Sequence, residues 1–168
     1  MNGSEEVEHL HRAYLCLGSN IQPEHNIREA VRLLRERARV TKLSTCWETE
    51  AVRGASTLPS APNFLNIAAL VETPLPPGAL KEQLLDPIER ELGRVRTADK
   101  YAPRTIDLDI TLFDEQVLDP EIWRRVYLAT IMSELLPELR HPESGERLED
   151  LAHRLRESSP AIPRPEIL

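Results

Sequence analysis

Apolar and polar residues recur along this chain with two periods, one typical of strands and one typical of helices. Residues 13–17 (Ala-Tyr-Leu-Cys-Leu) form a short apolar run that stops at Gly18-Ser19-Asn20, as expected of a buried strand entering a turn. Apolar residues then recur every three or four positions, which predicts an amphipathic helix with its charged residues outward; they are Ile27, Ala30, Val31, Leu34 and Ala38. The first predicted unit is therefore a strand followed by a helix.

The middle of the chain predicts two more strands and a second helix. Residues 40–52 are rich in threonine and favour a strand, and residues 53–62 have the composition of a loop. Residues 63–72 have the alternation of a third strand, in which Phe64 and Asn66 share a face. The second helix opens at residues 76–78 and carries an apolar stripe at Leu80, Leu84, Ile88 and Leu92.

Two residues mark where this second helix bends and where it ends. Pro87 lies inside the helix and has no amide hydrogen to donate, so we expect a kink near Asp86. Gly93 is suited to the position just after a helix, because glycine readily adopts the left-handed conformation required there.

The last part of the chain predicts a fourth strand and additional helices. Residues 106–113 favour a strand, which a turn at Asp114-Glu115 connects to a short strand at residues 116–118. Helices are expected at residues 126–139 and around residues 148–155. The order βαββαβ, followed by extra C-terminal helices, predicts an α+β ferredoxin-like sandwich.

The same pattern predicts a single domain with irregular ends. We expect a disordered leader at residues 1–12, one folded domain at residues 13–157, and a loose proline-rich tail at residues 158–168.

Charge and cysteine content narrow the class of protein. A net charge of −7 argues against broad binding to nucleic acids or anionic membranes, so any polyanion must meet a local basic cluster. Cys16 and Cys46 lie in predicted strands without metal-motif neighbours, which favours buried free thiols in a reducing compartment over a disulfide. Because no apolar run reaches the roughly 20 residues of a membrane helix, and residues 1–12 are too polar for a signal peptide, we expect a cytoplasmic protein.

Candidate chemistry concentrates in residues 93–110. The apolar residues of the fourth strand share one face, so Asp107 and Asp109 share the other, with their backbones about 6.5–7 Å apart. Such a pair suits hard divalent cations. The planar guanidinium groups of three nearby arginines suit phosphate oxygens: Arg94, Arg96 and Arg104. Alone the acid pair could be a solvated strand face, but with the arginines it indicates a metal–polyphosphate site.

This segment resembles the signature of the 6-hydroxymethyl-7,8-dihydropterin pyrophosphokinase family. The family pattern runs basic-x-Gly/Ala-Pro-Arg-x-x-Asp-aliphatic-Asp-aliphatic-aliphatic, and residues 100–111 read Lys-Tyr-Ala-Pro-Arg-Thr-Ile-Asp-Leu-Asp-Ile-Thr, departing only at Thr111. The opening Leu-Gly-Ser-Asn of residues 17–20 and the Glu-x-x-Leu-Gly-Arg that starts at Glu89 are also similar to the family. The resemblance extends from about Tyr14 to Leu155.

The resemblance implies a reaction and a set of site residues. Pyrophosphate passes from ATP to the hydroxymethyl oxygen of a dihydropterin in folate biosynthesis, leaving AMP, and two Mg²⁺ ions are held by Asp107 and Asp109. Together with those aspartates, Arg94 and Arg104 form the expected catalytic set. The nucleotide and its ions are expected at Glu89, Arg94, Arg96, Arg104, Asp107, Asp109 and Arg125. The pterin is expected at Thr49, Val52, Phe64, Asn66 and Tyr127, with aromatic rings stacked on it and the Asn66 amide paired to its edge.

One segment departs from the family and leaves an alternative open. Between the fourth strand and the next helix the family usually has a Pro-His-Pro or Pro-His-Tyr stretch whose histidine contacts ATP. Here Leu118 is followed by a shorter stretch, residues 119–125, without that histidine. The alternative is therefore a catalytically impaired pterin- or nucleotide-binding relative. An RNA-binding domain of the same fold is disfavoured by the acidic charge and by the lack of an aromatic RNA-binding pattern.

The remaining expectations concern partners and histidines. We expect small-molecule partners, the dihydropterin and ATP, and no nucleic-acid or membrane partner, and the sequence is compatible with a monomer. The five histidines have no metal-ligand spacing along the chain and are interpreted as surface or turn residues: His9, His11, His25, His141 and His153.

Overall fold

A seven-stranded antiparallel sheet lies at the centre of the protein in this computed structural model, which describes residues 8–51, 62–98 and 103–168. Within those residues the strand order is β6-β5-β1-β4-β3-β7, and β2 also pairs with β4. The strands are β1 His11–Ser19, β2 Arg39–Leu43, β3 Trp47–Thr49, β4 Phe64–Thr73, β5 Asp107–Phe113, β6 Gln116–Val117 and β7 Ala161–Pro163. β1 therefore lies between β4 and β5.

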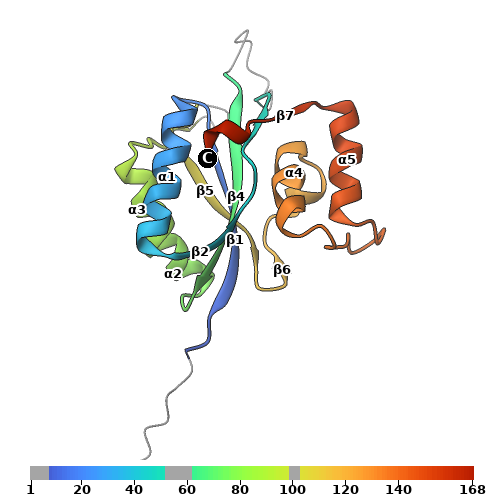
Figure 1. Ribbon diagram of the computed structural model, residues 1–168. Helices are drawn as coiled ribbons and strands as arrows, with labels where there is room; N and C mark the ends of the chain where they lie inside the picture. The colour runs from blue at the N-terminus through green and yellow to red at the C-terminus, as the bar shows by residue number, and fades with distance from the viewer. Residues whose placement is uncertain (1–7, 52–61, 99–102) are drawn as a thin grey trace, which may run out of the picture.

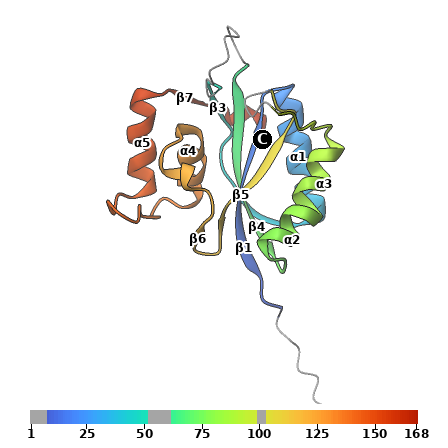
Figure 2. The same cartoon turned by 180° about the vertical axis from the view of Figure 1, so that it is seen from behind.

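Helices cover both faces of this sheet (Figures 1 and 2). One face carries α1 Pro23–Arg37, α2 Pro77–Leu80 and α3 Asp86–Glu91, and the other carries α4 Val126–Leu135 and α5 Leu148–Ser158. A π-helical segment, η1 Lys81–Leu85, connects α2 to α3, and two short 3-10 helices are η2 Pro120–Trp123 and η3 Pro165–Ile167. The predicted α+β ferredoxin-like fold is confirmed. Each helix in the described ranges is too short or too polar to cross a bilayer.

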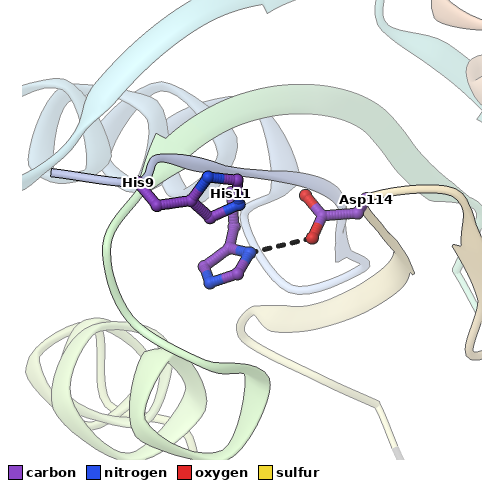
Figure 3. A group of neighbouring side chains, drawn as sticks. All are labelled: His9, His11 and Asp114. Carbon is purple, nitrogen blue, oxygen red and sulfur yellow. Dashed lines mark hydrogen bonds and ion pairs between the residues drawn. The ribbon is translucent and has the colours of Figure 1, made fainter. Parts of the chain in front are cut away.

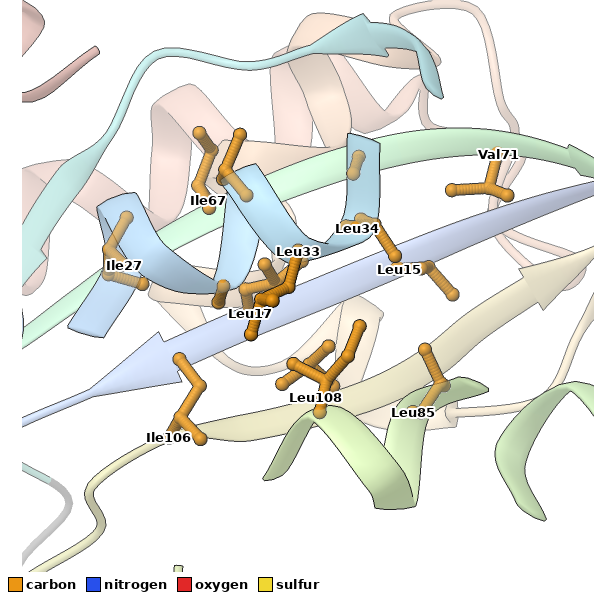
Figure 4. Packing of buried hydrophobic residues seen from close by; sticks show 14 of the residues in the cluster. Leu15, Leu17, Ile27, Leu33, Leu34, Ile67, Val71, Leu85, Ile106 and Leu108 are labelled. Carbon is orange, nitrogen blue, oxygen red and sulfur yellow. The ribbon is translucent and has the colours of Figure 1, made fainter. Parts of the chain in front are cut away.

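A hydrophobic core forms on each face because strand side chains alternate. Figure 4 shows the first core, in which Leu15, Leu17 and Leu108 of the sheet pack against Ile27 and Leu34 of α1. The second core joins the opposite face to α4 and α5 through Tyr14, Leu70, Leu112, Leu128 and Ile131. Each fully buried leucine contributes about 1.5–3 kcal/mol, so both layers hold the central strands in a fixed register.

The predicted second strand, residues 40–52, is divided into β2 and β3. Ser44 causes the interruption. Its amide donates to the carbonyl of Ala68 at 2.9 Å, and its hydroxyl accepts from the amide of Ala68 at 2.8 Å. A side chain thus replaces one backbone partner of the ladder, and the chain leaves the regular register at that point.

The irregularity expected near Asp86 is a wide turn. Residues Lys81–Leu85 form a π-helical segment, η1, in which the amide of Asp86 donates to the carbonyl of Lys81, five residues earlier. A regular helix would bring the ring of Pro87 against the carbonyl four residues before it, and the wider turn relieves that clash. The helix predicted at residues 126–139 ends earlier, at Leu135, because Pro137 excludes the helical conformation from Leu136.

The structure corrects both predicted ends of the domain. His11 and Arg12 belong to β1, where they pair with Thr73 and Glu72, and residues 1–7 of the expected leader lie outside the described residues. The expected loose tail is ordered. β7 pairs with β3, and Ile167 is only 2% exposed within the first core. Proline-rich composition concealed this order, because the prolines occupy an edge strand and the start of η3, where few ladder amides are needed.

Candidate functional site

Strand register places the acid pair beside the predicted pterin residues. Gly18 of β1 pairs with Asn66 of β4 on one side and with Asp107 of β5 on the other. Cys16, two residues earlier, pairs with Asp109. Neighbouring strands lie about 4.8 Å apart, so the backbones of Asn66 and Asp107 are separated by roughly 10 Å, with only a glycine between them. The side chains in this row point to the same face of the sheet.

A cavity of about 290 Å³ lies over this row. It is on the face that α4 and α5 cover, next to the start of α4, where Arg125 and Tyr127 stand. Its lining residues are Cys16, Gly18, Thr49, Glu50, Ala51, Phe64, Asn66, Arg104, Asp107, Asp109, Glu121, Arg125 and Tyr127. β5 contributes the carboxylates of Asp107 and Asp109 to this lining, and β4 contributes the aromatic ring of Phe64 and the amide of Asn66.

The two aspartates have opposite electrostatic environments. Burial acts to raise the pKa of Asp107, but its ion pairs with Arg94 and Arg104 outweigh burial and hold that pKa below its ordinary value. Asp109 has no ion pair among the described residues. Burial of its carboxyl group in the cavity wall and the charge of Asp107 raise the pKa of Asp109 to about 6. The site thus contains one neutralised carboxylate and one whose ionisation is opposed.

A buried glutamate connects the arginines to the strand that carries the aspartates. Glu89 is 3% exposed, and its carboxylate accepts from the amide of Leu108 at 2.8 Å and lies 3.5 Å from Arg94 and 3.2 Å from Arg96. Burial raises the pKa of Glu89, although the Leu108 amide and Arg94 oppose that change. Gly93, at φ 82°, ends α3 and turns the chain so that Arg94 points back to β5. These contacts fix the position of β5.

The β4 side of the cavity depends on one close approach. The amide nitrogen of Asn66 donates to the hydroxyl of Thr49 at 3.0 Å, and both side chains are buried. A Cβ atom added at Gly18 would lie 3.1 Å from the amide oxygen of Asn66. A larger residue at position 18 would therefore have to push the Asn66 amide aside by a few tenths of an ångström.

Two lining groups carry protons that they retain at neutral pH. Burial, followed by the charges of Asp109 and Asp107, raises the pKa of the Cys16 thiol well above its ordinary value. Burial, followed by Cys16, Asp119 and Asp109, likewise raises the pKa of Tyr127. Cys16 is thus a neutral thiol in the cavity wall and not an activated nucleophile.

Residues 119–125, the stretch that is shorter than in the family, contribute one positively charged side chain to the cavity, that of Arg125. Asp119 caps η2 by accepting from the amide of Glu121 at 3.0 Å. Glu121 then pairs with Arg124 at 2.5 Å and with Arg125 at 2.9 Å. Of these two arginines only Arg125 lines the cavity, whereas Arg124 is 71% exposed on the outside.

Most of the predicted site residues meet at this cavity. Those that line it are Thr49, Phe64, Asn66, Arg104, Asp107, Asp109, Arg125 and Tyr127. Glu89, Arg94 and Arg96 are not among its lining residues and connect to it through Asp107 and β5. Val52 lies outside the described residues.

Sequence reasoning missed the lining residues Cys16, Gly18, Glu50, Ala51 and Glu121. Alternation along β1 could have placed Cys16 and Gly18 on one face, but only the pairing of β1 with β5 shows that this face is also that of the aspartates. Glu50 and Ala51 follow Thr49 directly. No sequence signal indicated that Glu121 would turn inward.

Comparisons with known proteins match most of this chain to one family. Residues 14–137 match the model of the family described as 7,8-dihydro-6-hydroxymethylpterin-pyrophosphokinase. The 2-amino-4-hydroxy-6-hydroxymethyldihydropteridine pyrophosphokinase of Bacillus subtilis is 37% identical over 134 residues, which are 73% of this chain and 77% of the relative. The protein of the same name from Pseudomonas aeruginosa is 33% identical over 153 residues, which are 84% of this chain and 90% of that relative.

A solved structure shares the fold. Plasmodium falciparum HPPK-DHPS superposes with a TM-score of 0.66 at 13% sequence identity. The match covers 92% of this chain and 48% of the other, so this chain spans about half the length of that protein.

Proposed function

Because this chain belongs to the 7,8-dihydro-6-hydroxymethylpterin-pyrophosphokinase family, we propose that its cavity binds both substrates side by side, the pterin against β4 and ATP against β5. The chain is a Mg²⁺-dependent pyrophosphokinase that transfers the pyrophosphoryl group of ATP to 6-hydroxymethyl-7,8-dihydropterin in folate biosynthesis. The observation that carries the placement of the substrates is the row Asn66–Gly18–Asp107 across three neighbouring strands.

The pterin half of the cavity is built for a flat, polar ring. Asn66 offers an amide that is held in place by Thr49, and such a group pairs with the amide-like edge of a pterin. Phe64 and Tyr127 line the same space and provide aromatic surface for stacking. With the amide edge of the pterin at Asn66, the fused ring itself would span most of the roughly 10 Å to Asp107 over the bare backbone of Gly18, and its hydroxymethyl group would point toward Asp107.

The acid pair fits Mg²⁺. Both groups are carboxylates, the hard oxygen donors that Mg²⁺ prefers, and both face the cavity. Burial and the negative charge of Asp107 raise the pKa of Asp109, and a bound cation would favour its ionised form. Asp107 and Asp109 would hold two Mg²⁺ ions, whose charge offsets that of the triphosphate.

The arginines divide into two groups. Arg104 and Arg125 line the cavity, and we assign them to the phosphate oxygens. Arg94 is only 11% exposed and donates to Asp107 and, at 3.1 Å, to the carbonyl of Ile106. It therefore acts mainly as a positioning residue for Asp107. Glu89 of α3 and Arg96, which pairs with it from the segment after the helix, extend the same support, so we assign them an indirect effect on ATP.

Transfer needs no side-chain nucleophile. The hydroxymethyl oxygen of the pterin attacks the β-phosphorus of ATP, and an oxygen–phosphorus bond forms while the hydroxyl proton is released to solvent. The bond from that phosphorus to the α-phosphate oxygen breaks and AMP leaves. Cys16, the thiol nearest the acid pair in register, stays protonated. The chain contributes by aligning the two substrates. Arg104 and Arg125 supply positive charge that stabilises the negative charge spreading over the phosphate oxygens.

AMP formation from ATP, with and without the dihydropterin, tests this function. Wild-type protein should release AMP only when both the pterin and Mg²⁺ are present. Phe64→Ala and Asn66→Ala should weaken pterin binding and leave ATP binding within about twofold, because the two side chains lie on the pterin half. If both substrates bind and AMP never forms, the chain is a binding relative and not an enzyme.

A further inference from the structure

Two histidines and an aspartate meet at the end of the sheet opposite the cavity. His9 lies just before β1, His11 is the first residue of β1, and Asp114 begins the turn between β5 and β6 (Figure 3). One donor atom from each of the three residues lies within 4.8 Å of the other two. Asp114 comes five residues after Asp109, so this cluster is roughly 17 Å along β5 from the acid pair.

Two of the three groups are already held in place. The amide of Arg12 donates to one oxygen of the Asp114 carboxylate at 2.9 Å, and the amide of Asp114 donates to the carbonyl of Arg12 at 2.8 Å. The other carboxylate oxygen lies 2.8 Å from Nδ1 of His11, whose ring packs against Phe113 with centroids 4.8 Å apart. The residue at 114 adopts φ 53°, a left-handed conformation that Asp tolerates better than most residues. The carboxylate is thus aimed at the histidines by the backbone itself.

The third group is free to complete a site. His9 is exposed, and its ring lies edge-on to that of His11 with centroids 4.8 Å apart. Donors around a tetrahedral Zn²⁺, with bonds of about 2.0–2.1 Å, lie about 3.3 Å from one another. The present spacing therefore needs a closure of at most about 1.5 Å, which rotation of an exposed histidine side chain can supply.

We infer that His9, His11 and Asp114 form a binding site for a divalent ion of the zinc class. Two imidazole nitrogens and one carboxylate oxygen suit Zn²⁺, Co²⁺ or Ni²⁺, whereas Mg²⁺ prefers oxygen ligands alone. Three protein ligands leave a position open for water or another small ligand. The bound ion would join the start of β1 to the β5–β6 turn. The inference does not rest on the proposed placement of the substrates.

The sequence pattern indicates surface or turn residues at the histidines. That holds for His9, which is exposed, and for His141, whose ring nitrogen accepts from the amides of Glu143 and Ser144 within a turn. For His9 and His11 the missing partner was Asp114, which lies 103 residues beyond His11 in the chain and beside it in the sheet.

Calorimetric titration of the full chain with Zn²⁺, in excess Mg²⁺ that saturates the acid pair, tests the site. We expect one Zn²⁺ per chain, and a Co²⁺ titration should give a visible spectrum without sulfur charge transfer. His9→Gln should weaken Zn²⁺ binding at least about tenfold, since losing even an outer partner of a metal ligand costs about 10–100-fold. His25→Gln, an exposed histidine on α1, is the matched control and should bind as wild type does.

A second measurement guards against a misfolded variant. His9 is exposed, so His9→Gln should keep the wild-type circular dichroism and unfolding midpoint in the absence of zinc. In wild type, substoichiometric Zn²⁺ should shift the ring NMR signals of His9 and His11 before those of His25 and His153. Zinc binding that survives His9→Gln unchanged, that Mg²⁺ abolishes, or that is absent altogether overturns the inference.

Discussion

Replacing Asp109 with asparagine should make the protein more stable in the absence of Mg²⁺. In the folded protein the pKa of Asp109 rises from 3.8 to about 6, first through burial and then through the charge of Asp107. A carboxyl group with a raised pKa is harder to ionise in the folded state than in the unfolded state, so its charge destabilises the fold at neutral pH. Asparagine removes that charge and can still hydrogen-bond to Asp107.

The size of the effect follows from the shift. About two pKa units correspond to about 3 kcal/mol at 1.36 kcal/mol per unit. Protein atoms crowd the Asp109 carboxyl group and remove part of its hydration, yet the residue is exposed to the solvent of the cavity. Because that solvent screens the interaction, we expect a gain of about 1 kcal/mol at pH 7.5. For a chain of this size that is about 2–4 °C in the unfolding midpoint.

The pH dependence gives a sharper test. Below the unfolded-state pKa of Asp109, near pH 4, the carboxyl group is protonated in both states and the variant should match wild type. Between about pH 4 and pH 6 the unfolded wild type ionises Asp109 while the folded protein resists ionisation, so the advantage of the variant should grow over this range and keep its full value above pH 6. Urea unfolding at pH 3 and pH 7.5, with EDTA present, measures both limits.

Asp107→Asn, the same substitution two residues earlier, should destabilise the protein. Asp107 neutralises Arg94, which is only 11% exposed, and Arg104. Asp107→Asn therefore leaves the poorly hydrated guanidinium of Arg94 with Glu89, at 3.5 Å, as its remaining anionic partner, and should cost about 2–4 kcal/mol. If Asp109→Asn is as stable as wild type or less stable at pH 7.5, or if the two variants shift stability in the same direction, the electrostatic reasoning is refuted.

Three further outcomes are expected. Gly18→Ala should weaken pterin binding about tenfold and spare ATP in calorimetric titrations, because its Cβ would lie 3.1 Å from the Asn66 amide oxygen; equal loss of both ligands would contradict this. Arg125→Ala should weaken ATP binding about 10–100-fold, whereas Arg124→Ala should change it less than about twofold, and similar losses would show that both reach the nucleotide. Mg²⁺ affinity should fall by about tenfold per pH unit below pH 6 as Asp109 gains its proton, so a constant affinity from pH 7 to pH 5 would remove Asp109 from the metal site.

Local sequence patterns predicted the parts of this site that lie within one element. Alternation along β5 placed Asp107 and Asp109 on one face, and the same rule placed Phe64 and Asn66 together on β4. Gly93 was predicted to end the helix before Arg94, and it does so with φ 82°. These features depend on neighbours a few residues away, which is why the sequence alone reveals them.

Contacts between distant segments could not be predicted in this way. The tight space around residue 18 becomes evident only once β1 is seen beside Asn66. Residues 158–168 were expected to be a loose tail, yet Ile167 packs in the first core, and no local sequence pattern predicts this contact. The split of the second strand likewise depends on Ser44 meeting Ala68 across the sheet.

Pterin-dependent release of AMP by the Asp109→Asn protein is the measurement that tests the central claim most directly. The variant is expected to be folded and slightly more stable than wild type, so a loss of activity cannot be attributed to unfolding. If the acid pair of β5 is the centre of pyrophosphoryl transfer, phosphorus NMR should show AMP and the pterin diphosphate forming in equal amounts with wild type, and about 10²–10³-fold more slowly with the variant. Near wild-type turnover by a folded Asp109→Asn protein would place the reaction elsewhere.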